Sequence, residues 1–434
     1  MQKVKVIGAG LAGSETAWYL ANKGVKVELI DIKPKKFTPA HSNKNYGELV
    51  CSNSLKSNDV YGNAAGLLKE ELRILGSLVI EAGDKTKVPA GNALAVNRED
   101  FAKYITDALT SHPNITCVCE EVQDIDFDEW TVIATGPLTL DALSNRISQI
   151  VGEKLHFFDA SAPIVDAESI DMDNAFILDR YGEEGGDHIN CPMNKEEYLE
   201  FIEQLRNAQK ATLHEFENSE VFEGCMPIEV MADRGVDTLR FGPLKPRGLT
   251  DPKTGRWPYA CLQLRKEDER GSMYNLVGFQ TNLLFPEQKR VFSIIPALKN
   301  AEYLRYGVMH RNTFINAPEV LNPDYSLKKY PKTFFAGQIT GVEGYVESIA
   351  SGLMAGIHLE RKLNGKPPIT IKDCTVMGAL TTYITTKNKD FQPMNANFGI
   401  LPPLDRIIRD KKLKKSEMAK RSLEEVLLLK KEIE

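Results

Sequence analysis

The sequence lacks a long hydrophobic run. No stretch of its 434 residues approaches the ~18 consecutive apolar residues of a transmembrane helix. A secretory signal does not fit the start, because the first apolar run, Val4 to Ile7, is followed at once by glycines. The seven cysteines are odd in number and form no CxxC pair, which is typical of reduced thiols in a cytosolic protein. We therefore expect a cytoplasmic protein that does not enter the membrane.

Patterns typical of metal sites, sequence repeats and low-complexity tracts are also missing. The seven histidines are scattered, and none lies at ligand spacing from a cysteine. We therefore expect no metal, and we expect His41 to be a solvated loop residue rather than part of a site. No CxxxxC follows the first glycine-rich segment, which argues against a disulfide reductase of the glutathione-reductase type.

Neither sign of charge is in large excess. Hydrophobic residues make up 42% and charged residues 26% of the chain, as in ordinary globular proteins. The net charge of −6 excludes a uniformly basic nucleic-acid binder. Residues 406–421, however, contain eight Lys or Arg and two acids, a local net charge of +6. This segment is either a solvated helix face or a strip that contacts phosphates.

The first part of the chain has the pattern of a strand–helix–strand unit that binds a dinucleotide. Lys3 to Ile7 predicts a buried parallel strand, Gly8 to Gly13 a tight turn, and Ser14 to Lys23 a helix. Val25 to Ile30 predicts a second strand, which Asp31 closes. These elements give the GxGxxG fingerprint its expected structural context.

Each glycine of this turn has its own expected task. Gly8 makes the turn, Gly10 lets the backbone approach a pyrophosphate, and Gly13 lets the helix pack closely on the strand. The helix N-terminus supplies N–H groups for the pyrophosphate, and Asp31 accepts hydrogen bonds from ribose hydroxyls. The residues expected to bind the dinucleotide are Gly8, Ala9, Gly10, Leu11, Ala12, Gly13 and Asp31.

Two later segments favour FAD over other nucleotides. Residues 333–352 predict a strand, a glycine turn and a small-residue helix, which is either an ordinary crossover or the element that closes many flavin sites. Residues 130–137 predict a short strand ending in Ala-Thr-Gly that returns the chain to an FAD domain. NAD or S-adenosylmethionine would need neither segment. The cofactor residues expected here are Gly136, Gly337, Gln338, Gly341 and Gly344.

The length predicts two or three domains, and the middle of the chain differs from its ends. It contains an acidic stretch, amphipathic helical segments around 195–211, and turns rich in glycine and proline at 242–258. We expect an α/β protein with a Rossmann-type, GR2-like FAD-binding domain formed by residues 1–160 and 330–434. Residues 161–329 are expected to form an inserted α+β domain that binds the substrate.

Two cysteines lie in polar, irregular contexts, which favour reactive thiols. Cys51 lies in a segment rich in serine and asparagine, and Cys225 lies between a glycine and a Met-Pro pair. Cys117 and Cys119, by contrast, alternate in an apolar segment and are expected to be strand residues that face one side. Cys51 and Cys225 are therefore the candidate catalytic residues.

Six segments carry a resemblance to a known family: GAGLAG (8–13), ELVCSNSL (48–55), FEGCMPIE (222–229), LRFGPLKPRG (239–248), VGFQTN (277–282) and FAGQITGVEG (335–344). They resemble the folate- and FAD-dependent tRNA (uracil-5-)-methyltransferase family, TrmFO, a relative of the GidA/MnmG flavoproteins. The resemblance runs over nearly the whole chain, and the two cysteine contexts are far more specific than the Rossmann glycines. GidA-type proteins are considerably longer, so the length favours the TrmFO branch.

The resemblance implies a mechanism and its co-substrates. Cys225 matches the family's nucleophile, whose thiolate adds to uracil C6 and makes C5 carbanion-like. Cys51 matches the second essential cysteine, which removes the C5 proton or holds the intermediate. The carbon comes from 5,10-methylenetetrahydrofolate, and FAD reduced by NAD(P)H carries the electrons.

The resemblance also implies tRNA as the partner, with a target uridine in the T-loop that must be extruded to react. Phosphate contacts are expected from basic side chains of two segments: Lys245, Arg247, Arg256, Lys411, Lys412, Lys414 and Lys415. Three alternatives stay open. A paralogous enzyme would methylate ribosomal RNA, an FAD oxidoreductase would act on a small metabolite, and an FAD-stabilised module would bind RNA without catalysis.

Overall fold

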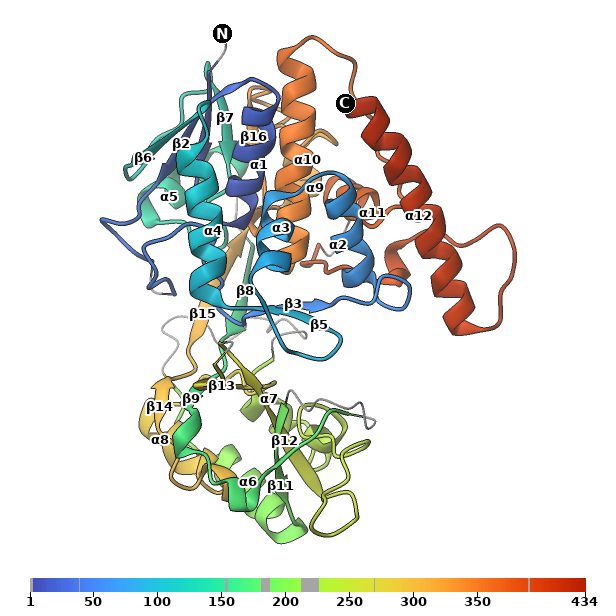
Figure 1. Ribbon diagram of the computed structural model, residues 1–434. Coiled ribbons are helices and arrows are strands. Elements are labelled where there is room, and N and C mark those ends of the chain that lie inside the picture. The colour runs from blue at the N-terminus through green and yellow to red at the C-terminus, as the bar shows by residue number, and fades with distance from the viewer. Residues whose placement is uncertain are drawn as a thin grey trace.

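A five-stranded parallel sheet forms the centre of the larger of two parts of the molecule (Figure 1). The computed structural model describes residues 3–38, 40–152, 155–180, 188–211, 226–268, 270–388 and 391–434. In spatial order the strands are β16 (Thr333–Phe335), β7 (Trp130–Ile133), β1 (Lys3–Ile7), β2 (Lys26–Asp31) and β6 (Ile115–Cys119). The expected strands at 3–7 and 25–30 are confirmed, and the short strand expected within 130–137 covers Trp130–Ile133. Val4, Val6 and Val132 are fully buried, as expected for a parallel sheet covered on both faces.

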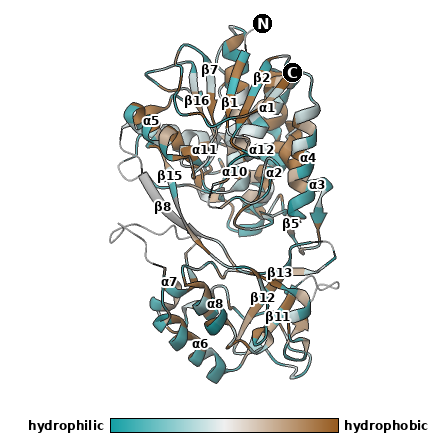
Figure 2. Cartoon of the chain, turned by 90° about the vertical axis from the view of Figure 1, so that its left-hand side faces the viewer, coloured by the Kyte–Doolittle hydropathy of each residue, from teal (hydrophilic) through white to brown (hydrophobic). Residues whose placement is uncertain are grey.

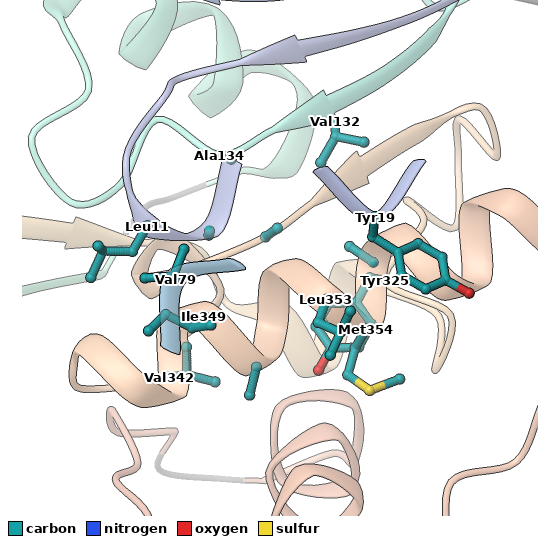
Figure 3. Close-up of a cluster of buried hydrophobic side chains, with 14 of the residues drawn as sticks. Leu11, Tyr19, Val79, Val132, Ala134, Tyr325, Val342, Ile349, Leu353 and Met354 are labelled. Atoms are coloured by element: carbon teal, nitrogen blue, oxygen red, sulfur yellow. The ribbon is translucent and has the colours of Figure 1, made fainter. Parts of the chain in front are cut away.

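Helix α1 (Leu11–Asn22) packs along the long helix α10 (Tyr345–Leu363), and Figure 3 shows side chains of both helices in the buried cluster beneath the sheet. A Cβ at Gly352 would overlap the backbone of Ala12, so glycine is needed where the helices touch. The prediction that the helix begins at Ser14 is wrong. The helix begins at Leu11, because the Ser14 N–H already bonds to the Gly10 carbonyl at 2.9 Å, inside the expected turn.

The larger part also contains a second, smaller sheet and further helices. A small sheet contains β3 (Ser54–Ser57), β5 (Ala93–Val96) and β4 (Lys87–Val88). The helices are α2 (Ala64–Ile74), α3 (Leu78–Lys85), α4 (Arg98–Ser111), α5 (Asp141–Val151), α9 (Ala317–Val320), α11 (Val376–Thr385) and α12 (Lys411–Ile433). No helix in the described ranges is long and apolar enough to cross a membrane.

The smaller part, the insert, is built on an antiparallel sheet. Its strands are, in spatial order, β10 (Phe176–Ile177), β11 (His188–Met193), β12 (Ala260–Lys266), β13 (Met273–Leu276), β9 (Ile164–Asp166) and β14 (Tyr303–Arg305). Its helices are α6 (Lys195–Asn207), α7 (Ile228–Asp233) and α8 (Phe285–Phe292). Helix α6 buries Tyr198, Phe201 and Leu205 and turns its charged side outward, so it is largely teal in Figure 2.

Two antiparallel strands, β8 (Leu155–Ala160) and β15 (Met309–Phe314), carry the chain into and out of the insert. Each part has its own hydrophobic core, one of them confined to residues between Val165 and Ala301. Residues Phe314 to Leu327 contribute to the core of the larger part. The predicted architecture, a Rossmann-type α/β fold with an inserted α+β part, is confirmed, whereas the domain limits 161–329 stay a prediction.

Candidate functional site

A cavity lies where the carboxyl ends of β1, β2 and β7 meet the N-termini of α1 and α10. Its empty volume is about 1210 Å³, part of which is open to solvent. Crevices at the carboxyl ends of parallel strands are the usual ligand sites of open α/β sheets. The predicted cofactor residues that line it are Gly8, Ala9, Gly10, Leu11, Ala12, Asp31, Gly136, Gly337 and Gln338.

The glycines of this cavity leave room for a ligand. Gly8 has a φ of +100°, and a Cβ there would lie 2.5 Å from the Ala134 carbonyl oxygen, so the turn requires glycine. A Cβ at Gly10 or Gly136 would instead meet nothing within 4 Å. Because both residues line the cavity, their missing side chains leave space that a pyrophosphate or flavin ring fits. The residues present therefore fit a dinucleotide such as FAD.

Three predicted cofactor residues do not line the cavity. Gly13 packs against the Gly8 carbonyl, which agrees with its expected packing task. Gly341, with a φ of +89°, lies against the Phe391 ring, and Gly344, with a φ of +125°, lies against the Glu347 carboxylate. Gly341 and Gly344 shape the backbone that leads from β16 into α10.

Asp31 is held at the rim of the cavity by backbone N–H groups. Its Oδ2 accepts a hydrogen bond from the Ala9 N–H at 2.7 Å, and its Oδ1 accepts one from the Lys33 N–H at 2.9 Å. These bonds orient the carboxylate while leaving lone pairs on both oxygens for hydroxyl donors. The position expected for a ribose-binding acid at the end of β2 is therefore occupied by a fixed carboxylate.

Cys51 lies beside the cavity because its loop is attached to the start of α10. The Tyr345 hydroxyl oxygen accepts hydrogen bonds from the Cys51 N–H at 2.7 Å and the Ser52 N–H at 3.2 Å. Tyr345 and Val50 both line the cavity. Burial raises the pKa of Tyr345 well above its ordinary value, so the hydroxyl stays neutral. Sequence reasoning missed Tyr345, although its place directly after Gly344 marks it as the first residue of the helix.

A buried ion pair forms another wall of the cavity. Lys33 Nζ lies 2.6 Å from Glu48 Oε2, and their side chains are 8% and 10% exposed. Burial raises the pKa of Glu48, but the hydrogen bonds from Lys33 and the Ser42 N–H outweigh it and lower the pKa overall. The expectation that His41 is a solvated loop residue is wrong. His41 lines the cavity, and burial together with the nearby Lys33 charge lowers its pKa.

Three other cysteines, Cys117, Cys119 and Cys225, carry predictions of their own. Cys117 and Cys119 lie on β6 opposite Leu29 and Asp31 of β2, which confirms that they are strand residues. Cys225 lies outside the described residues, so its assignment as the catalytic nucleophile stays a prediction. No group of His, Cys, Asp or Glu suited to a metal ion occurs in the part of the chain that the structure describes.

The predicted RNA-contacting residues lie on both parts of the molecule. Lys411, Lys412, Lys414 and Lys415 are exposed at the N-terminal end of α12. Arg247 and Arg256 are exposed and Lys245 half-buried on the loops of the insert that precede β12. Two exposed aromatic side chains that sequence reasoning missed, Phe241 and Trp257, belong to the same loops of the insert and are 83% and 55% exposed.

Comparison with known proteins identifies close relatives over the full chain. The family model of glucose inhibited division protein A (GidA) matches residues 3–367. A methylenetetrahydrofolate–tRNA-(uracil-5-)-methyltransferase TrmFO of Acetivibrio thermocellus is 55% identical over 97% of this chain and 97% of its own. Proteins of the same name from Halalkalibacterium halodurans and Staphylococcus epidermidis are 54% identical, each over 98% of this chain and at least 97% of its own.

Solved structures share the architecture. Aquifex aeolicus GidA superposes with a TM-score of 0.73 and covers 99% of this chain, which spans 73% of the GidA chain. The two sequences are 17% identical, so the likeness concerns the fold.

Proposed function

The chain belongs to the GidA family and, within it, to the TrmFO group, and we propose that it transfers a one-carbon unit from 5,10-methylenetetrahydrofolate to C5 of a uracil in tRNA. The observation that carries this proposal is the 55% identity to a TrmFO protein over 97% of both chains. The glycine-lined cavity supports it, because its residues fit FAD and reduction of a methylene to a methyl group requires electrons. The protein acts in the cytoplasm, where tRNA, folate and NAD(P)H are its substrates.

Thiol chemistry explains why the reaction needs cysteines. Uracil C5 is a poor nucleophile until a thiolate adds at C6, which places a negative charge on an enolate. Cys225 is assigned this addition, and Cys51 is assigned removal of the C5 proton or support of the intermediate. FAD, when bound and reduced by NAD(P)H, supplies the electrons for the methyl group. Cys51 is well placed for its part, because its loop is hydrogen-bonded to Tyr345 at the cavity wall.

The RNA side of the proposal rests on charge and exposed aromatic rings. A uridine in the T-loop must leave its stack to reach the cavity, and single-stranded RNA bases commonly stack on aromatic side chains. Phe241 and Trp257 are exposed in the loops that carry Lys245, Arg247 and Arg256. Stacking on the rings and phosphate contacts to the cations would together hold an extruded loop.

The decisive experiment traces the one-carbon unit from methylenetetrahydrofolate into tRNA. Purified protein is incubated with unmodified tRNA transcript, isotope-labelled methylenetetrahydrofolate and NAD(P)H, and 5-methyluridine is mapped by mass spectrometry. Label is expected at a T-loop uracil, only when NAD(P)H is present, and not from labelled S-adenosylmethionine. Label in a ribosomal RNA fragment but not in tRNA would assign the chain to the paralogous reaction. Transfer from S-adenosylmethionine, or from neither donor, would contradict the proposal.

A further inference from the structure

The loop that carries Cys51 is held by more than the cavity wall. From the larger part, Arg98 Nη1 donates hydrogen bonds to the carbonyl oxygens of Leu49 at 2.9 Å and Val50 at 3.3 Å. Tyr345 accepts the N–H groups of the next two residues. The backbone on both sides of the thiol is therefore fixed by side chains from α4 and α10.

The insert holds the same loop from the opposite side. Arg265, near the end of β12, donates from Nη2 to Ser52 Oγ at 2.7 Å and from Nε to Asn53 Oδ1 at 3.1 Å. Asn53 in turn donates from Nδ2 to the Lys266 carbonyl oxygen at 2.9 Å. In Figure 1, the small sheet of β3 and β5, which follows this loop, lies on the side of the larger part that faces the insert.

Glu267 completes the connection. Its carboxylate lies 2.7 Å from Arg98 Nε and 3.4 Å from Arg98 Nη2, and its side chain is only 2% exposed. A buried ion pair contributes little net stability, because desolvation of both charges offsets their attraction. Its geometric consequence is clearer: Glu267 orients the guanidinium that binds the carbonyls of Leu49 and Val50. The insert thus reaches the Cys51 loop directly through Arg265 and indirectly through Glu267.

We propose that Arg265 and Glu267 are positioning residues that fix the Cys51 loop and link its position to the insert. The proposal rests on the proposed function, because it takes Cys51 as a thiol that acts on the substrate. If RNA binds the insert through the loops before β12, any displacement of β12 is transmitted to residues 49–53. Placement of the thiol would then depend on how the insert is held.

The kinetic test uses Glu267→Gln and Arg265→Gln in the FAD-loaded full-length enzyme. We expect kcat for 5-methyluridine formation to fall about ten- to a hundredfold, because small displacements of reacting groups cost that much. The KM values for tRNA and methylenetetrahydrofolate, the FAD content and the rate of flavin reduction by NAD(P)H are expected to stay within about twofold. Glu267→Asp, which keeps the charge, is expected to recover part of the lost kcat.

A matched control and a readout independent of turnover accompany this test. Arg290→Gln removes a more exposed ion pair within helix α8 of the insert, with Glu287 at 2.7 Å, and is expected to change none of these values. Hydrogen–deuterium exchange of the 49–53 peptide is expected to speed up in Glu267→Gln and Arg265→Gln but not in Arg290→Gln. This exchange test holds even if the wild-type enzyme does not methylate tRNA, so the two proposals fail separately.

Three results would overturn the inference. One is unchanged kcat and unchanged exchange in both variants. Another is a rise in the KM for tRNA alone, which would make these residues RNA contacts. If either variant loses FAD or unfolds, Ser52→Ala replaces it, because it removes the hydroxyl that accepts from Arg265 and leaves the guanidinium in place. The same hydroxyl also accepts the Ser54 N–H at 3.1 Å, so exchange is read at residues 49–53 alone. Unchanged exchange at 49–53 in Ser52→Ala is the third contradicting result.

Discussion

At the scale of single residues, a substitution of Gly10 should affect ligand binding without affecting the folding of the protein. Its φ of −73° suits any residue, and a Cβ there would meet nothing within 4 Å. A side chain at this position therefore extends into the cavity without straining the backbone. Gly13 differs, because a Cβ there would overlap the Gly8 carbonyl and disturb the contact of α1 with β1.

We predict that Gly10→Leu abolishes FAD binding and leaves the melting temperature of the apoprotein unchanged, because the added side chain occupies only the ligand's space. Flavin absorbance after purification and a thermal melt with and without added FAD measure this. Gly13→Leu is the matched control, and it is expected to lower the melting temperature of the apoprotein as well. A Gly10→Leu protein that keeps its yellow colour would contradict the cofactor assignment.

The roles of the two cysteines can be told apart with a modified RNA. Fluorine at uracil C5 blocks loss of the C5 proton, so the thiol that added at C6 stays covalently attached. We predict that tRNA containing 5-fluorouridine forms an adduct with Cys225 and that Cys225→Ala abolishes both the adduct and turnover. Cys117→Ala, which changes a thiol on β6, is the control and leaves both intact. An adduct mapped to Cys51 would reverse the assigned roles.

At the scale of secondary-structure elements, Glu71 joins three helices. It belongs to α2, its two carboxylate oxygens accept the N–H groups of Val376 at 2.7 Å and Met377 at 3.0 Å at the start of α11, and Ser422 of α12 donates to it. The side chain is fully buried. Burial raises the pKa of Glu71 from 4.5 to about 7, because desolvation outweighs these hydrogen bonds.

This raised pKa predicts a pH dependence of stability. The folded state binds the Glu71 proton more tightly than the unfolded state, so the stabilisation is fully present below pH 4.5 and is lost as the pH rises through about 7. The loss amounts to about 3 kcal/mol at most. Chemical denaturation across this pH range measures it. Glu71→Gln, which resembles the protonated form, should flatten the profile, and an equally steep profile in this variant would contradict the assignment.

Helix α12 begins with a charge pattern that its own dipole disfavours. Its first five residues include Lys411, Lys412, Lys414 and Lys415, and its first turn contains no acidic residue. The Asp410 side chain caps the helix by accepting the Leu413 N–H at 2.7 Å. Cations at a helix N-terminus cost about 0.3 to 1 kcal/mol each. A function in binding phosphate would explain why lysines stand there.

We predict opposite effects on stability and binding when these four lysines are changed to glutamine. The helix should become more stable, because the repulsion from its dipole is removed. The affinity for tRNA should fall, and the slope of log K against log salt should decrease by roughly 0.7 to 0.9 per lost contact. Binding titrations at several salt concentrations measure this, with Lys431→Gln at the other end of α12 as the control. Unchanged affinity and slope would make this segment a solvated helix face.

At the scale of the whole molecule, local patterns were predictable and long-range contacts were not. The strand at 3–7, the tasks of Gly8 and Gly13 and the strand cysteines follow from residues close in the sequence. Tyr345 and Arg265 meet the Cys51 loop from more than 200 residues away, and no local periodicity specifies such a contact. The error at His41 has the same origin, because distant segments of the chain fold over its loop and enclose it in the cavity wall.

The cations predicted to contact phosphates form two sets, which lie on different parts of the molecule. Lys245, Arg247 and Arg256 belong to the insert, whereas the four lysines of α12 belong to the larger part. If one tRNA contacts both parts, each set contributes its own phosphate contacts. Independent contributions to binding free energy add when the sites share no partners.

We therefore predict that neutralising the insert set and the α12 set each weakens tRNA binding, and that the combined variant loses the product of the two factors. Its salt slope should fall by the sum of the two single decreases, because each set releases its own counterions. Filter binding or fluorescence anisotropy at graded salt measures all four proteins. If one set has no effect, alone or in combination, the RNA rests on a single part of the molecule. A combined loss much smaller than the product would instead show that the two parts bind the RNA cooperatively, because losing the contacts at one part would then already weaken the contacts at the other.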